Sequence, residues 1–297
     1  MSTIKGVSFG EVLFDVFMKH KNIGGAPLNV ASRLKSFGIE VSMISAVGND
    51  NNGNELLEYF KNLDIDTSSI QVKENYPTGV VNVRLNEKGN ASYDITYPSA
   101  WDKIRLSIDD TELVKNADFF IYGSLASRDE STKKTLLQLL EVAKYKIFDV
   151  NLRVPHYTEK TLIELMNFAD FIKFNDDELF EIANYLNSNH RSLEQNIKFI
   201  AKETNTDTIC VTLGSHGAVL YCKEKFYNNC GFKVDVVDTV GSGDSFLASL
   251  ISKLFSEVDP QEALNFACAV GAIVAQYEGA NPEISQSEID EFLNGIY

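Results

Sequence analysis

Basic side chains are scarce in this sequence. Lys and Arg total 27 against 42 Asp and Glu, which gives a formal net charge of −15. Binding to nucleic acid requires clustered cations, so this charge argues against a polyanionic partner. It argues equally against attachment to an anionic membrane surface. The charge therefore removes nucleic-acid binding and membrane binding from the expected functions.

Metal-binding and disulfide patterns are also missing. The four cysteines show no C-x-x-C spacing, and the four histidines are scattered without an H-E-x-x-H pattern. Structural zinc sites have tight ligand spacing, so we expect none here. Four cysteines in a chain of 297 residues are typical of small buried side chains in a protein from a reducing compartment.

Long hydrophobic runs are absent too. The stretch 1–17 carries Glu11 and Asp15 within its apolar segment, which makes it a poor signal peptide. The longest apolar run, 266–275, is too short to span a bilayer. No Pro/Ser-rich linker or internal repeat divides the chain. We therefore expect a soluble, cytoplasmic protein that forms a single large α/β domain, residues 1–297.

The sequence does contain a regular alternation of strand-like and helix-like segments. The strand-like segments are short and rich in Val, Ile, Phe and Tyr, and they end near Gly, Asn or Asp. Between them, apolar residues recur at helical spacing, as at Val30, Leu34 and Phe37. This alternation predicts a mostly parallel central sheet with helices on both faces and ligands at the carboxyl ends of its strands. The expected strands are 7–9, 41–47, 119–122, 147–150, 171–174 and 208–213.

One stretch departs from this pattern. Residues 78–97 alternate apolar and polar side chains with period two on both sides of a turn at 86–90, which predicts a hairpin with one apolar face. The hairpin is either an extra edge of the main sheet or part of a small β lid, built from about 11–23 and 78–105, over a site. An exposed apolar face would predict a lid-mediated homodimer. That face comprises Val81, Val83, Tyr93 and Ile95.

The segment with the most chemical information is glycine-rich. A β-like run, 232–237, leads into it and a helical run, 245–255, follows. Gly241 and Gly243 let backbone N–H groups point at an anion, and the helix N-terminus adds partial positive charge. Asp244 would repel a phosphate unless it has a task, such as removing a proton from a substrate hydroxyl. The alternative is an N-capping Asp after a glycine turn.

Two familiar nucleotide motifs do not occur. Phe246 stands where G-x-G-x-x-G needs its third glycine, and no G-x-x-x-x-G-K-[ST] is present. Any nucleotide phosphate is therefore handled without the Walker lysine.

A second glycine pair lies near the start of the chain. Gly24 and Gly25 precede a helical stretch and let a small ligand approach the backbone. Asn29 can donate and accept hydrogen bonds, and Asp15 can accept two from hydroxyls. Such groups suit a polyhydroxylated ligand, although a capped helix with a polar first turn would show the same residues.

These two segments, in this order, resemble signatures of the ribokinase-like (PfkB) family of carbohydrate kinases. The stretch 238–244 resembles the family's D-T-x-G-A-G-D, with Ser242 at the usual Ala, and 24–38 resembles its Gly-Gly signature. The resemblance spans essentially the whole chain and implies a ribokinase-like fold. The further matching segments are 149–153 (D-x-N-x-R), 173–178 (K-x-N-x-x-E), 212–217 (T-L-G-x-x-G) and 271–282 (last helix and G-A-x-P).

The resemblance implies catalytic roles around the glycine-rich segment. Asp244 would be the general base, and the N–H groups of Gly241, Ser242 and Gly243 would form an anion hole. Arg153 would meet the phosphate or the sugar. Read singly, Arg153 could equally be a surface ion-pair partner.

The resemblance also implies sites for ATP and for cations. Asn175 and Glu178 would organise Mg²⁺ through waters, or they could simply begin the helix that follows. Asp238 and Val240 would contribute to a K⁺ site beside the anion hole. The residues implied at the nucleotide site are Asn175, Thr212, Gly214, Gly217, Ala269 and Ala272.

Within the family, the segments 10–15, 25–31, 97–102 and 123–128 are most similar to fructokinases. Kinases of phosphorylated sugars tend to place Lys in the Gly-Gly motif, where this chain has Ala and Pro. The resemblance therefore implies a neutral sugar acceptor, most simply fructose phosphorylated to fructose 6-phosphate. The alternatives are another sugar, a sugar acid or a ribonucleoside as acceptor, or a non-catalytic sugar or nucleotide sensor.

Several side chains are candidates for contact with that acceptor. Tyr97 and Trp101 either cover one face of the sugar or pack in the core. Four cations flank the expected lid and could serve a charged substrate instead: Lys19, Lys21, Arg84 and Arg105. The residues expected to hold the sugar are Asp15, Gly24, Gly25 and Asn29.

Overall fold

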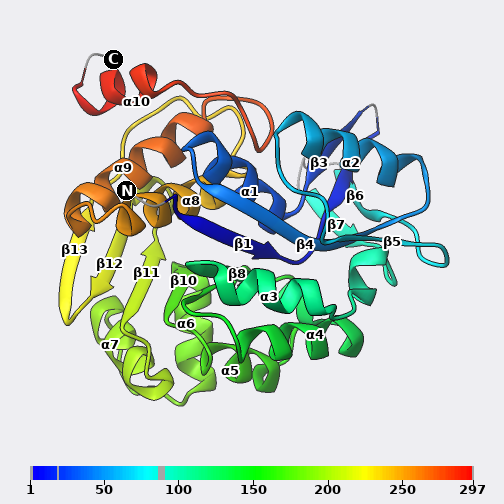
Figure 1. The fold of residues 1–297 in the computed structure, drawn as a ribbon. Helices are drawn as coiled ribbons and strands as arrows, with labels where there is room; N and C mark the ends of the chain where they lie inside the picture. The colour runs from blue at the N-terminus through cyan, green and yellow to red at the C-terminus, as the bar shows by residue number, and fades with distance from the viewer. Residues whose placement is uncertain (1–2, 19, 86–90, 296–297) are drawn as a thin grey trace.

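The computed structural model describes residues 3–18, 20–85 and 91–295, and within these ranges the chain forms a nine-stranded sheet and a second, four-stranded sheet (Figure 1). Neighbouring strands of the large sheet are parallel, except that β12 pairs antiparallel with both β11 and β13. Across the sheet the order is β13 (Lys225–Asn229), β12 (Ala218–Cys222), β11 (Thr208–Thr212), β10 (Phe171–Asn175), β9 (Lys146–Asp149), β8 (Phe119–Gly123), β1 (Lys5–Phe9), β4 (Glu40–Gly48) and β5 (Ile70–Lys73).

All six strands expected from the sequence are present, which confirms the predicted α/β sheet. The prediction of a strand at 232–237 is wrong, because no strand forms there. Val236 and Val237 are exposed, and the backbone N–H groups of Val237 and Asp238 both donate to the carbonyl of Ala275. This segment is therefore held by a helix end and not by a strand partner.

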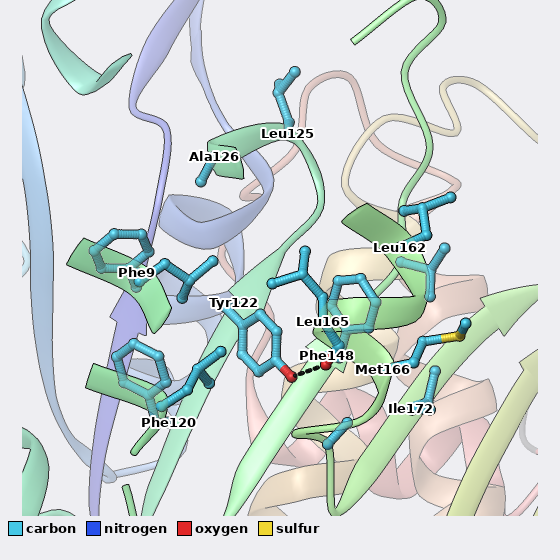
Figure 2. Close-up of a cluster of buried hydrophobic side chains, with 14 of the residues drawn as sticks. Phe9, Phe120, Tyr122, Leu125, Ala126, Phe148, Leu162, Leu165, Met166 and Ile172 are labelled. Carbon is cyan, nitrogen blue, oxygen red and sulfur yellow. Dashed lines mark hydrogen bonds between the residues drawn. The ribbon is translucent and has the colours of Figure 1, made fainter. Parts of the chain in front are cut away.

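The large sheet buries a separate apolar cluster on each face. In β8, Phe119 and Ile121 point into one cluster, and Phe120 and Tyr122 point into the other, as strand geometry requires. Figure 2 shows part of the second cluster, where the Tyr122 hydroxyl donates to the carbonyl of Leu165 at 2.9 Å. Tyr122 is buried there without leaving its hydroxyl unpaired.

Helices cover both faces, as predicted (Figure 1). One layer comprises α1 (Ala26–Ser36), α2 (Asn51–Asn62), α8 (Ser242–Phe255) and α9 (Pro260–Val274), and α10 (Gln286–Leu293) packs on α9. The other layer comprises α3 (Ile108–Asn116), α4 (Glu130–Leu140), α5 (Glu159–Met166), α6 (Asp176–Tyr185) and α7 (Leu193–Thr204). In the part of the chain that the structure describes, none of these helices is both long and apolar enough to cross a bilayer.

The hairpin belongs to the second sheet, so its interpretation as an edge of the large sheet is wrong. This small sheet has the order β3 (Lys21–Gly24), β2 (Leu13–Val16), β6 (Gly79–Leu85) and β7 (Ala91–Ile95). Its strands fall within the two segments predicted for a lid. The predicted turn at 86–90 lies outside the described residues, as do the side chains of Arg84 and Tyr93 and the whole of Lys19.

The described residues of the small sheet's apolar face are already buried within a single chain. Val81, Val83 and Ile95 are buried and belong to the same cluster as Leu13 and Trp101. The predicted lid-mediated homodimer required this face to be exposed, so the premise of that prediction is wrong.

The strand order changes direction at β1. This strand pairs with β4 on one side and with β8 on the other. The chain passes from β1 to β4 in one direction across the sheet and from β8 to β9 in the opposite direction, so the two connections diverge. In open parallel sheets such a point forms a crevice at the carboxyl ends of the strands, where ligands bind. The residues that follow β1, β8 and β9 are therefore the first place to look for a site.

Candidate active site

The two glycine-containing segments of the sequence meet through one hydrogen bond. Asn29 lies in the first turn of α1 and Asp244 in the first turn of α8, 215 positions apart. The Asn29 side-chain amide donates to a carboxylate oxygen of Asp244 over 2.8 Å. Asn29 is only 3% exposed, so this contact is fixed by packing. The structure thus joins the residues predicted for sugar binding to the predicted base.

The turn before α8 can be made only with glycine. Gly241 has a φ of 76°, in the left-handed region, and a Cβ there would lie 2.5 Å from the Cα and carbonyl oxygen of Ala280. Gly243 differs, because a Cβ there would meet nothing closer than the Lys173 ammonium at 3.7 Å. The close approach of the turn to Ala280 therefore depends on Gly241 alone.

We predict that Gly241→Ala destabilises the fold by more than about 1–2 kcal/mol, the ordinary cost of a left-handed alanine, because the backbone of Ala280 must also move. Gly243→Ala is the matched control and should leave the thermal midpoint nearly unchanged. Thermal denaturation of both variants measures the difference. Equal midpoints would contradict the packing described for this turn.

The start of α8 offers part of the predicted anion hole. The first N–H groups of a helix have no partner within it and carry partial positive charge. One of the three predicted donors is already engaged, since the N–H of Ser242 donates to the carbonyl of Thr239 over 3.3 Å. The Ser242 hydroxyl, in contrast, is buried without a partner among the described residues. An anion at this helix terminus would meet a polar, positively polarised surface.

Charged groups from two neighbouring strands, and from the loop that follows one of them, lie near Asp244. Burial, together with the negative charge of Asp149, raises the pKa of this carboxyl to about 6, against the opposing effects of Asn29, Lys173 and Arg153. The Lys173 ammonium contacts Asp149 at 2.9 Å, and both side chains are buried. Asp244 is therefore placed to exchange a proton near neutral pH, as a general base must.

Glu11 is a further buried carboxyl that the sequence did not single out for a role. It follows β1, and burial raises its pKa to about 7. One of its carboxyl oxygens has no hydrogen-bond partner among the described residues, and neither has one oxygen of Asp149. Both residues line a cavity of about 10 Å³, which is room for about one water molecule. Ser124 and Asn151 complete its polar lining at the predicted crevice.

The predicted sugar-binding residues gather along the Gly-Gly turn. A Cβ on Gly24 would lie 2.5 Å from a carboxylate oxygen of Asp15, and one on Gly25, at a φ of 112°, would lie 2.6 Å from the carbonyl oxygen of Glu11. Burial raises the pKa of Asp15 to about 6, against the opposing charge of Arg153. Asp15 and Asn29 therefore flank a turn that packs closely on its neighbours, because positions 24 and 25 carry no side chain.

We predict that kcat/KM for the acceptor falls steeply as the pH drops below about 6. In the predicted roles, Asp15 and Asp244 would both accept hydrogen bonds or protons in the ionised form, and burial raises the pKa of each to about 6. Because two groups must be ionised, kcat/KM should fall by up to about 100-fold for each pH unit on the acid side. At saturating acceptor, kcat should fall by about tenfold for each pH unit. A profile that stays flat to about pH 5 would contradict the roles of both carboxylates.

Of the two aromatic candidates for contact with the sugar, the structure contradicts one, and the role of Tyr97 stays a prediction. Trp101 is fully buried, with the Arg128 guanidinium 4.0 Å from the ring centre, so its predicted contact with the sugar is wrong and the packing alternative holds. Tyr97 is 56% exposed, and its hydroxyl donates to Asp129 over 2.9 Å. Its ring also lies beside Arg128, at 5.2 Å.

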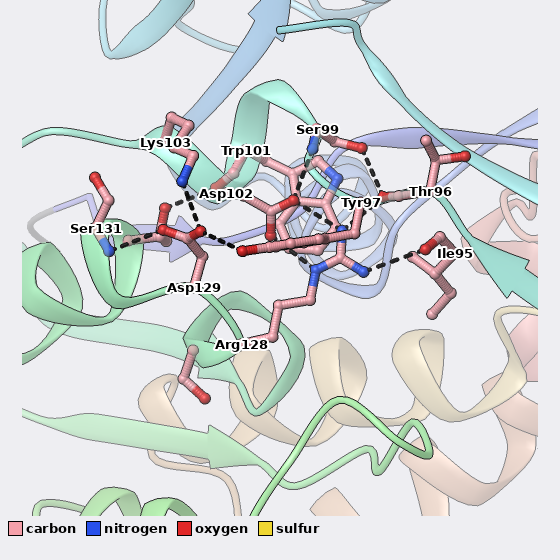
Figure 3. A network of polar contacts seen from close by, with 12 residues as sticks. Ile95, Thr96, Tyr97, Ser99, Trp101, Asp102, Lys103, Arg128, Asp129 and Ser131 are labelled. Atoms are coloured by element: carbon pink, nitrogen blue, oxygen red, sulfur yellow. Dashed lines mark hydrogen bonds and ion pairs between the residues drawn. The ribbon is translucent and has the colours of Figure 1, made fainter.

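Arg128 connects the small sheet to the helical layer, as Figure 3 shows. It contacts both carboxylate oxygens of Asp102 at 2.8 Å and donates to the carbonyl of Thr96, next to the end of β7, at 2.7 Å. A second ion pair lies beside it, between Lys103 and Asp129 at 2.6 Å. Several of its members lie in the segments 97–102 and 123–128 that resemble fructokinases, but nothing in the sequence predicted that these segments pair with each other.

A cleft of about 690 Å³, a typical size for a small-molecule site, adjoins the first turn of α8. It is lined by Thr212, Gly214, Gly217 and Ala272, as predicted for a nucleotide, and by Ser242 and Gly243. Ala269 is fully buried and does not line it, so that prediction is wrong. Sequence analysis did not predict that Phe246 and all residues of 230–236 except Asp235 also line the cleft.

The residues predicted to organise Mg²⁺ form a helix cap in this structure. The Asn175 side chain accepts from the N–H of Glu178, and the Glu178 carboxylate accepts from the N–H of Asn175, both at 2.8 Å. The other oxygen of Glu178 accepts from the N–H of Leu152 at 2.9 Å. Asn175 does not line the cleft. Among the described residues, no group of three or more Asp, Glu, His or Cys side chains is arranged to hold a metal ion directly. An Mg²⁺ ion near this cap would therefore have to be held through bridging waters, as Mg²⁺ commonly is.

Three further predicted residues lie beside these groups. Asp238 accepts from the N–H of Val240 at 3.0 Å and from that of Gly279 at 3.1 Å, so it braces two turns. Arg153 is exposed, and its charge lowers the pKa values of Glu11, Asp15 and Asp244. Arg153 is therefore close enough to interact electrostatically with Asp244 and with the carboxylates of Glu11 and Asp15.

A buried carboxylate at a helix N-terminus, with a Gly-Gly turn and a cleft of nucleotide size beside the same helix, has the features expected of an α/β kinase that acts on a small molecule. Residues 5–287 match the pfkB family carbohydrate kinase, and the chain belongs to this family.

Known proteins that resemble the chain agree with that class. A probable fructokinase-2 from Arabidopsis thaliana is 29% identical, over 94% of this chain and 92% of the relative. The structure of a Vibrio cholerae fructokinase with fructose, ADP and calcium is similar with a TM-score of 0.83 and 22% identity, over 98% of this chain and 99% of that one. An aminoimidazole riboside kinase from Salmonella enterica, in complex with aminoimidazole riboside and an ATP analogue, has a TM-score of 0.82 and 22% identity, over 97% of this chain and 99% of that one.

Proposed function

We propose that this protein transfers the γ-phosphoryl group of ATP to a hydroxyl of a neutral sugar, converting fructose to fructose 6-phosphate. The hydrogen bond between Asn29 and Asp244 carries the proposal, because it brings the hydroxyl-binding turn to the base. Gly243, next to Asp244, lines the nucleotide-sized cleft. Donor and acceptor sites would therefore adjoin each other at the first turn of α8.

The chain's own residues would perform the transfer mainly by positioning and electrostatics. Asp15 and Asn29 would hold sugar hydroxyls, and Asp244 would take the proton of the attacking hydroxyl as the oxygen bonds to phosphorus. The N-terminus of α8 would stabilise negative charge on the transferred group, with the positive charge of Arg153 nearby. Leaving-group charge would pass to the β-phosphate of ADP.

Cations would complete the nucleotide side. Asn175 and Glu178 would hold Mg²⁺ through water molecules, and this ion would neutralise charge on the phosphates when bound. Asp238 and Val240 would contribute to a K⁺ site at the neighbouring turn. These assignments rest on the family motifs.

The neutral character of the acceptor has support from the small sheet. Ala26 and Pro27 stand at the Gly-Gly motif, where a cation would serve a sugar phosphate. The Lys21 ammonium turns to α2, where it contacts Asn52 and Glu55. It is therefore occupied away from Asp15. Similarity to fructokinases over nearly the whole chain favours fructose among neutral sugars.

A ribonucleoside is the second candidate acceptor, because the fold is equally similar to that of the aminoimidazole riboside kinase. ADP release should be followed with ATP, Mg²⁺ and a panel of fructose, glucose, ribose, a keto-deoxy sugar acid and a ribonucleoside. Fructose should give the highest kcat/KM, and a reaction without acceptor gives the background. A higher value for another acceptor would replace fructose, and no stimulation by any acceptor would favour a sensor.

A further inference from the structure

A second asparagine stands behind the contact between Asn29 and Asp244. Asn281, in the turn between α9 and α10, donates from its side-chain amide to the side-chain oxygen of Asn29 over 2.8 Å. Asn29 in turn donates to Asp244 over the same distance. Three side chains from distant parts of the sequence thus form one directed chain of hydrogen bonds.

The direction of this chain matters because a carboxamide has one donor end and one acceptor end. With its oxygen occupied by the Asn281 donor, Asn29 must present its NH₂ group to Asp244. If Asn29 rotated by half a turn, its oxygen would face both the Asp244 carboxylate and the space in which the sugar hydroxyl is expected. The Asp244 carboxylate can only accept, so it already favours this orientation of Asn29, and the donor from Asn281 reinforces it. The Asn281 oxygen itself has no partner among the described residues.

The turn that carries Asn281 is itself held rigidly. Arg33, which is buried on α1, donates to the carbonyl of Pro282 at 2.8 Å and to the Ser245 hydroxyl at 3.2 Å. Gly241 packs directly against Ala280. The clamp by Arg33 and the close approach at Gly241 fix the position of Asn281 relative to both α1 and α8.

We propose that Asn281 is a positioning residue for the proposed phosphoryl transfer, which orients Asn29 so that Asp244 stays ionised and aimed at the acceptor. This inference rests on the proposed function, because it assigns Asp244 its role as base. The comparisons and the family motif cover the turn, yet they give no role to this side chain.

The expected effect is electrostatic and has a definite sign. Burial and Asp149 raise the pKa of Asp244, while Asn29, Lys173 and Arg153 lower it, and Glu11 is a further charge within range. Loss of the directed donor removes one of the stabilising contributions, so the pKa must rise. A hydrogen bond to a charged group corresponds to a shift of about one pH unit.

The test compares the pH profile of kcat at saturating fructose in the wild-type protein, Asn281→Ala and Asn281→Asp. The acid limb of Asn281→Ala should move up by about one pH unit, so that kcat falls about tenfold on that limb and recovers at higher pH. Asn281→Asp should shift it further, because the new carboxylate attracts the NH₂ group of Asn29. Glu283→Ala, an exposed change in the same turn, is the control and should leave the profile in place.

A carbon NMR titration of the Asp244 carboxyl in the nucleotide-free protein gives a readout that does not depend on turnover. It should show the same upward shift in Asn281→Ala. An unchanged titration, or an equal fractional loss of kcat at every pH, would overturn the role of Asn281 even where the wild-type protein phosphorylates fructose. Absence of turnover in the wild-type protein would instead count against the proposed function.

Discussion

Asp244→Asn should lower kcat by roughly 10²–10⁴-fold, the usual contribution of a general base. The side chain lies at the start of α8, where burial brings its pKa to about 6, so it is ionised and still basic near neutral pH. Asparagine has the same shape and can still accept from Asn29, but it cannot take a proton. KM for the sugar should therefore change little.

Asp235→Asn is a matched control for this prediction. It removes the same charge from an exposed position close in sequence that does not line the nucleotide cleft. Steady-state kinetics of both variants, with binding of sugar and nucleotide measured in parallel, separate loss of chemistry from loss of affinity. Unaltered turnover in Asp244→Asn would show that Asp244 is not the general base.

Arg128→Met should lower the free energy of unfolding by about 3–5 kcal/mol, the usual cost of leaving one partner of a buried ion pair. The side chains of Arg128 and Asp102 are 3% and 0% exposed. Without the guanidinium, the Asp102 carboxylate would keep only the N–H of Ser99, at 2.8 Å, among the contacts described for it. The end of the small sheet would also lose its link to the carbonyl of Thr96.

Two further variants test whether the loss comes from the buried charge. Lys103→Met removes the neighbouring, partly exposed ion pair and should cost only about 1 kcal/mol, since Asp129 keeps the Tyr97 hydroxyl and the N–H of Ser131. Adding Asp102→Leu to Arg128→Met should recover part of the stability. Denaturant unfolding measures all three, and a wild-type midpoint for Arg128→Met would contradict this account.

The sequence predicted the large sheet well because its signal is local. Each buried parallel strand is a short run of Val, Ile and Phe between turn residues, and such runs are legible without any partner. The same signal failed at 232–237, where Val236 and Val237 are exposed and Val234 and Val236 line the nucleotide cleft. Composition cannot distinguish a strand from an extended segment, because the two differ only in whether a neighbouring strand is hydrogen-bonded to them.

The nucleotide side shows a prediction that helical geometry could have improved. The α9 residues that line the cleft are Cys268, Gly271, Ala272 and Ala275, whose spacing is one face of a helix. Ala269 lies about 100° from Cys268 around the helix axis and points into the core. Small residues alone could not tell the two faces apart.

Contacts between distant segments could not be predicted in the same way. The hydrogen bonds among Asn281, Asn29 and Asp244 join three parts of the chain, and no spacing in the sequence records them. The pairing of Arg128 with Asp102 could not be predicted for the same reason. The family motifs indicated which residues meet at the site, whereas the residues that orient them became visible only in the fold.

The central claim is that one phosphoryl group passes from ATP to fructose across the first turn of α8. Phosphorus NMR of the protein with ATP, Mg²⁺ and fructose tests it most directly. The account predicts that ADP and fructose 6-phosphate appear in equal amounts, and that the same mixture with Asp244→Asn remains nearly unchanged over the same time. Release of inorganic phosphate without a sugar phosphate, or equal product from both proteins, would contradict it.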